Sequence, residues 1–74
     1  MTDRQREANA DILARRIKFY ATENYFFYGF YAEQDYSYLY KLVLDKNLVT
    51  IYDFLIYAER DTGFREGFKS EVAR

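Results

Sequence analysis

The most constraining feature of this sequence is its aromatic content. Nine Tyr and seven Phe occur among 74 residues, and four Ile, six Leu and three Val add further large apolar side chains. A domain of this size buries only about 60% of the surface that its unfolded chain exposes. Because so small a core cannot enclose all of these side chains, we expect some Tyr rings to lie at the surface unless a partner or a second copy covers them.

Residue types that are missing exclude several kinds of site. The chain contains no Cys, His, Pro or Trp. Without Cys there is neither a disulfide framework nor a thiolate nucleophile, and without Cys or His a zinc or haem site is not expected. The chain also lacks the Asp-rich loop of calcium sites and the Gly-rich loop that ends in Gly-Lys-Ser/Thr. We therefore predict no cofactor and no metal, and a fold that depends on packing alone.

Charge distribution weighs against a nucleic-acid binder. The net charge is −1, and residues 23–61 carry seven acidic but only three basic side chains. The aromatic middle of the chain would therefore repel phosphate. No apolar leader follows the charged N-terminus, and no apolar run approaches the roughly 18 residues that span a bilayer. These features predict a cytoplasmic protein with no membrane partner.

The N-terminal segment has the clearest helical pattern. Thr2 and Gln5 fit a capping box, in which each side chain hydrogen-bonds the backbone of the other residue. Leu13, Ile17 and Tyr20 then form an apolar stripe at helical spacing. A helix is predicted over 3–22.

The middle of the chain is ambiguous. Residues 25–31 are apolar on every side, so periodicity does not separate a helix from a strand, and we interpret them as a short helix. Over 36–46, a helix places Ser37, Lys41 and Asp45 on one polar face, which a strand does not. Residues at both ends also favour the helix: Asp35 is suited to be its N-cap, and Asn47 is suited to end it in a left-handed conformation.

Two more helices are predicted, over 50–60 and 64–73. Thr50 and Asp53 begin the first with a spacing like that of a capping box, and Phe64, Phe68 and Val72 recur every four residues in the second. The fold class predicted is all-α, a single domain spanning 1–74 and built as a small compact bundle of about four short helices. The alternative is an α+β fold with a hairpin over 38–54.

Catalysis is not predicted. Glu33 and Asp35 are close in sequence, but general acid–base chemistry needs a pocket that shifts pKa values, and we interpret them as a solvated loop and a helix cap. Ser37 and Ser70 have no basic partner at a motif spacing. An enzyme with a Tyr/carboxylate site remains the third interpretation.

A protein-binding role follows from the Tyr cluster. Tyr25, Tyr28 and Tyr31 recur every three residues, and Tyr offers a large rigid ring with a polar tip. We expect a non-catalytic interaction module that docks sterically, pairs with itself and suits a small accessory or inhibitor protein, such as those that phages direct against host machinery. The residues predicted to bind the partner are Tyr25, Tyr28, Tyr31, Glu33, Asp35, Tyr36 and Tyr38.

The alternative function is a nucleic-acid-associated regulatory protein. Cations interleaved with aromatic rings are typical of single-strand binding. The residues that would carry this alternative are Arg15, Arg16, Lys18 and Arg65.

Overall fold

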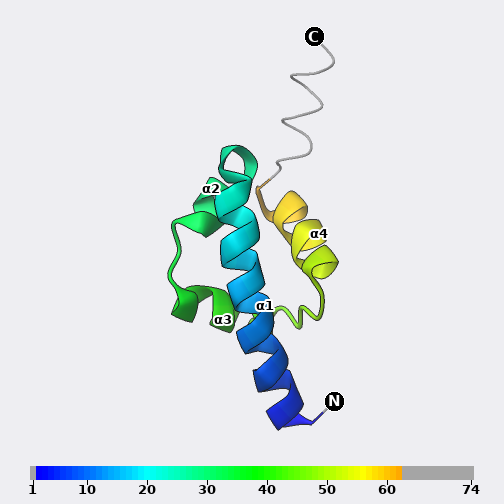
Figure 1. The fold of residues 1–74 in the computed structure, drawn as a ribbon. Coiled ribbons are helices and arrows are strands. Elements are labelled where there is room, and N and C mark those ends of the chain that lie inside the picture. Colours follow the sequence, from blue (N-terminus) through cyan, green and yellow to red (C-terminus); the bar gives the residue numbers. More distant parts are fainter. Residues whose placement is uncertain (1, 63–74) are drawn as a thin grey trace.

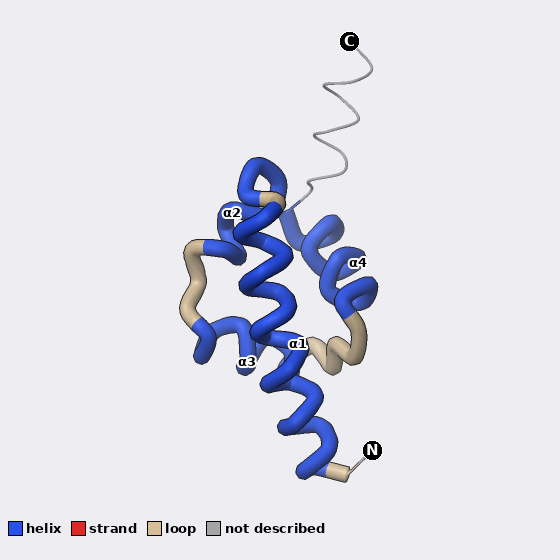
Figure 2. The backbone as a smooth tube through the Cα atoms, viewed as in Figure 1, coloured by secondary structure: helices blue, strands red, loops and turns tan. Residues whose placement is uncertain are grey.

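A computed structural model describes residues 2–62 of the chain, and these residues form four helices (Figure 1). No strand occurs within this range (Figure 2). The helices are α1 (Asp3–Glu23), α2 (Tyr25–Ala32), α3 (Tyr36–Asp45) and α4 (Ile51–Thr62).

The predicted all-α bundle is confirmed, and the alternative hairpin is wrong. Residues 38–54 form the body of α3, a turn and the start of α4 instead of paired strands. The polar residues of α3 favour the helix because a strand would have left apolar side chains on its polar face. The short helix at 25–31 is also confirmed, as α2, whereas the helix predicted over 64–73 lies outside the described residues.

Helix starts follow the capping residues. Thr2 Oγ1 accepts a hydrogen bond from the Gln5 N–H at 3.2 Å, and Gln5 Oε1 accepts one from the Thr2 N–H at 2.9 Å. Asp35 Oδ1 likewise accepts from the Tyr38 N–H at 2.9 Å and begins α3. These side chains satisfy donors that the first turn of a helix leaves without an intrahelical partner.

The end of α3 is a Schellman motif. Asn47 has a positive φ of 53°, the left-handed conformation predicted for it. The Leu48 N–H donates to the Val43 carbonyl at 3.0 Å and the Asn47 N–H to that of Leu44 at 3.3 Å, the pair of bonds that defines the motif. Arg6 Nη2 donates to Asn47 Oδ1 at 3.2 Å, so the turn is also attached to α1.

The core lies along one side of α1. Small residues on that side let the neighbouring helices approach closely, because Ala10, Ala14 and Ala21 are fully buried. The larger buried side chains are Leu13, Ile17, Tyr28, Tyr31, Leu39, Leu42, Val43, Leu48 and Phe54.

Aromatic rings join α2 to α4 inside this core. The ring of Tyr31 meets that of Phe54 edge to face, with centroids 5.0 Å apart. The Tyr31 hydroxyl donates to the Asp61 carboxylate at 3.1 Å. Burial and the charge of Asp61 raise the pKa of Tyr31 well above its ordinary value, so this hydroxyl stays protonated as a donor. The eight-residue α2 is thereby fixed from its inner side.

Candidate protein-binding surfaces

The structure divides the predicted Tyr face. Tyr28 and Tyr31 are only 8% and 1% exposed, and both belong to the core. The backbone of α2 is kinked at Tyr28, whose φ of −120° and ψ of 21° are not helical, so residues before and after the kink do not share one helical face. The prediction that Tyr25, Tyr28 and Tyr31 form one outward side is therefore corrected: of the three rings, Tyr25 alone is exposed.

A different set of rings occupies the outward side of α2. Phe26 is 89% exposed, and Tyr25 and Phe30 are about half exposed. Tyr38 of α3 extends this surface, since its ring centroid lies 6.3 Å from that of Phe30. We call this surface the α2 outer face and define it by Tyr25, Phe26, Phe30, Glu33 and Tyr38.

The Tyr25 ring is held flat against its helix. A Cβ atom added at Gly29 would lie 3.2 Å from Tyr25 Cε1, so the ring occupies space that any other residue at position 29 would fill. The Tyr25 hydroxyl donates to Glu33 Oε1. This hydrogen bond, together with the negative charge of Glu33, raises the pKa of Tyr25. Both contacts fix the ring in one orientation on the surface.

Asp35, the second acidic residue of the predicted face, stabilises the start of α3. Asp35 is exposed and caps α3 through the Tyr38 N–H. Glu33 is engaged with Tyr25 on α2. The two carboxylates thus have separate partners, and their charges border the α2 outer face.

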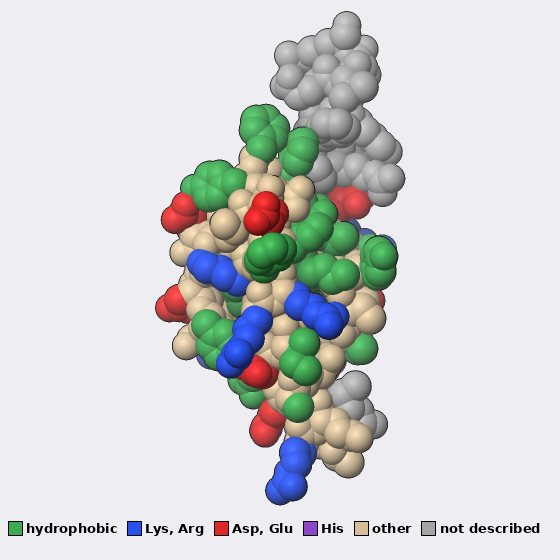
Figure 3. Space-filling model, viewed as in Figure 1, with side chains coloured by type: hydrophobic (Ala, Val, Ile, Leu, Met, Phe, Trp, Pro, Cys, Tyr) green, Lys and Arg blue, Asp and Glu red, His purple; other side chains and the backbone are tan. Residues whose placement is uncertain are grey.

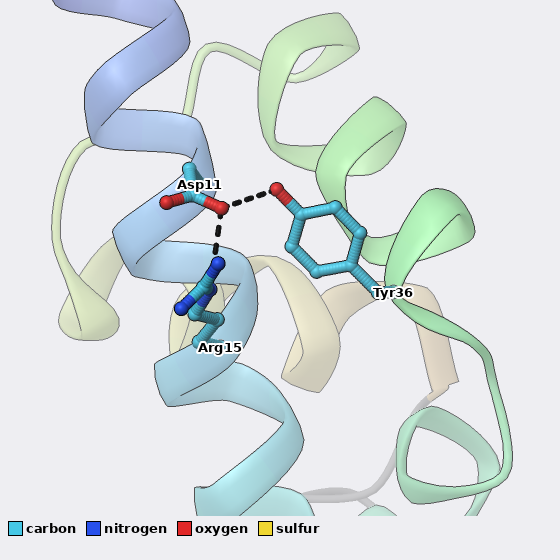
Figure 4. Close-up of polar contacts among 3 residues, drawn as sticks. All are labelled: Asp11, Arg15 and Tyr36. Carbon is cyan, nitrogen blue, oxygen red and sulfur yellow. Dashed lines mark hydrogen bonds and ion pairs between the residues drawn. The ribbon is translucent and has the colours of Figure 1, made fainter.

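Tyr36 belongs to a polar cluster between α1 and α3 (Figure 4). Its hydroxyl donates to Asp11 Oδ1, and Arg15 Nε lies 3.2 Å from the same oxygen. The Arg15 guanidinium also lies 6.0 Å from the centroid of the Tyr36 ring. The hydrogen bond to Asp11 and burial raise the pKa of Tyr36. This cluster attaches the start of α3 to α1.

The basic residues of the alternative function do not form one free patch. Arg15 is engaged in the cluster with Asp11 and Tyr36. Lys18 Nζ donates to the carbonyl of Gln34 at 2.7 Å and to that of Ala32, so it caps the end of α2. Arg16 is exposed, and its side chain has no hydrogen bond or ion pair within residues 2–62. Arg65 lies outside the described residues.

A second apolar surface runs between α1 and α4. Phe19 of α1 and Tyr52 of α4 are 69% and 72% exposed, and Ile12 is half exposed. Between the helices is a groove lined by Arg15, Arg16, Phe19, Tyr20 and Ile51. Hydrophobic side chains also cover much of the upper part of the molecule in Figure 3, over α2, α4 and the adjacent end of α1. We define the α1–α4 seam by Ile12, Phe19, Tyr20, Ile51 and Tyr52.

Sequence reasoning missed the seam and the two Phe of the α2 outer face. The predicted face relied on the spacing of Tyr and left out Phe26 and Phe30, although both lie in the same apolar run. The usable pattern was in α1, where Ile12 and Phe19 lie seven residues apart on the flank of the buried stripe.

The described residues offer few other features. Among residues 2–62, no three carboxylates are grouped as metal ligands would be. None of the four helices is both long and apolar enough to cross a bilayer. Comparison of the chain with protein-family models, curated proteins and solved structures gives no match.

Proposed function

We propose that the protein is a non-catalytic protein-binding module that docks through its α2 outer face. The observation that carries this proposal is the 89% exposure of Phe26 beside two further outward rings on the same short helix. Covering one such ring contributes about 1.5–3 kcal/mol, which a partner that buries the ring would gain.

The rigidity of α2 supports the proposal. The ring centroids of Tyr31 and Phe54 lie 5.0 Å apart on the inner side of α2. On the outer side, the Tyr25 ring is fixed against Gly29 and Glu33. Rings that are already ordered lose little conformational entropy when a partner covers them. Tyr and Phe held in this way are suited to act as anchors in a partner's pockets.

The charge of this face indicates what kind of partner fits. Glu33 and Asp35 border the rings, and an acidic rim attracts a surface whose apolar pocket is bordered by Lys or Arg. A small protein that covers such a pocket acts sterically, which suits an accessory or inhibitor role. The predicted cytoplasmic location remains part of this proposal.

A comparison of matched ring truncations tests the proposed face. The tagged chain is used to capture a partner from its host, and the captured protein is purified and titrated in solution. We expect Phe26→Ala and Phe30→Ala to weaken binding, whereas Phe19→Ala, which truncates a ring of intermediate exposure (69%, against 89% and 55%) on the seam, leaves it unchanged. Circular dichroism of each variant confirms that its helices are retained. Equal binding by all three variants would contradict the proposed face.

A further inference from the structure

The α1–α4 seam has the shape of two ridges beside a groove. Phe19 and Ile12 form the ridge on α1, and Tyr52, the neighbour of Ile51 in the chain, forms the ridge on α4. Tyr20 and Ile51 are half-buried between them. A surface of this shape can be covered by a second surface of the same shape, because the ridge of each fits the groove of the other.

Charges on the seam are arranged symmetrically around Phe19. Arg16 precedes this ring by three residues and Glu23 follows it by four, so all three lie along one exposed stripe of α1. Neither charged side chain has a hydrogen bond or ion pair within residues 2–62. The stripe therefore presents one unpaired charge of each sign, with an apolar ring between them.

We propose that a second copy of this chain covers the seam, with the two α1 helices antiparallel about a two-fold axis near Phe19. This arrangement places Arg16 of each copy opposite Glu23 of the other, so the same favourable pair forms twice. The Phe19 rings then meet close to the axis, where an isologous interface is most completely buried.

The charges of Arg16 and Glu23 also favour an antiparallel second copy over other partners for the seam. A parallel pair of α1 helices would place Arg16 beside Arg16 and Glu23 beside Glu23, which is repulsive. A nucleic acid would meet Glu23, and a strongly acidic protein would likewise leave that carboxylate facing like charge. An antiparallel second copy pairs both charges, and it does so without any contribution from the α2 outer face.

The test is charge reversal followed by charge exchange in the full chain. Sedimentation equilibrium of the wild type should give twice the 9.0 kDa mass of one chain. Arg16→Glu or Glu23→Arg alone creates two repulsive contacts, and each should weaken dimerisation by about tenfold. The double variant Arg16→Glu/Glu23→Arg exchanges the charges and should restore it. Lys41→Glu, at an exposed site on α3, is the matched control and should have no effect.

Several outcomes would overturn the proposal. These are a wild-type monomer at millimolar concentration, a trimer or larger oligomer, or single variants that dimerise as the wild type does. Dissociation by Phe26→Ala but not by Phe19→Ala would assign self-association to the α2 outer face. A monomer whose NMR spectra show contacts from Phe19 to residues 63–74 would assign the seam to the chain's own C-terminal segment.

Discussion

The α2 outer face and the α1–α4 seam both expose large rings, but they differ in how their polar groups are used. On the outer face, Glu33 is bonded to Tyr25 and Asp35 caps α3, so the acidic groups are fixed within the chain and of one sign. On the seam, Arg16 and Glu23 have opposite signs and no partner within residues 2–62. A preorganised surface of one sign suits a foreign partner of the other sign, whereas an unpaired surface of both signs can complement itself.

Both surfaces depend on the core beneath them, and the largest expected effect comes from removing it. Phe54 is fully buried and packs against Tyr31 and Tyr28. Phe54→Ala should lower the free energy of unfolding by about 3–5 kcal/mol, because it deletes a ring and leaves a cavity. Chemical denaturation followed by circular dichroism measures this loss. A loss below about 1 kcal/mol would mean that the ring cluster does not hold α2 against α4.

The next effect should separate the two surfaces. Phe26→Ala removes the most exposed ring of the α2 outer face and should cost about 2 kcal/mol or more of partner binding, as expected for an anchor. Its free energy of unfolding should change little, since the ring is exposed before the partner binds. Calorimetric titration with the purified partner measures the first quantity and denaturation the second. A variant that loses stability but binds normally would assign Phe26 to the fold.

A smaller effect is expected from Gly29→Ala, which tests whether the Tyr25 ring must lie flat. Ala is favoured over Gly in a helix by up to about 1 kcal/mol, and the exposed Tyr25 ring is able to move aside. The variant should therefore be as stable as the wild type or more stable, yet it should bind the partner less tightly. Tighter binding by the more stable helix would show that the flat orientation of Tyr25 is not required.

The smallest effect concerns acid and the start of α4. Hydrogen bonds from the backbone N–H groups of Thr50 and Val49 lower the pKa of Asp53. A lowered folded-state pKa contributes stability above the unfolded pKa, near 3.9 for Asp, and this stability is lost as pH falls through the lowered value. Wild type should therefore be more stable than Asp53→Asn at pH 7, with the difference shrinking toward pH 2. A difference independent of pH in denaturation experiments would contradict this role.

Much of the fold was predictable because the residues that begin and end its helices act locally. Thr2, Asp35 and Asn47 act on backbone groups within a few residues, so their roles were readable without knowledge of neighbouring helices. Which side of α2 faces the core was not predictable from the sequence. Every residue of 25–31 is apolar or Gly, and nothing in that run distinguishes the two sides. That choice depends on Phe54, which is distant in sequence and packs against Tyr28 and Tyr31.

Side-chain accessibility in solution tests the separation of the two surfaces most directly. A soluble paramagnetic agent broadens the NMR signals of exposed rings in the isolated full chain. At concentrations that allow dimerisation, we expect broadening of Phe26 and Phe30, protection of Phe19, and renewed broadening of Phe19 in Arg16→Glu. Phe19 as accessible as Phe26 in the wild type, or Phe26 protected in the absence of any partner, would contradict the account.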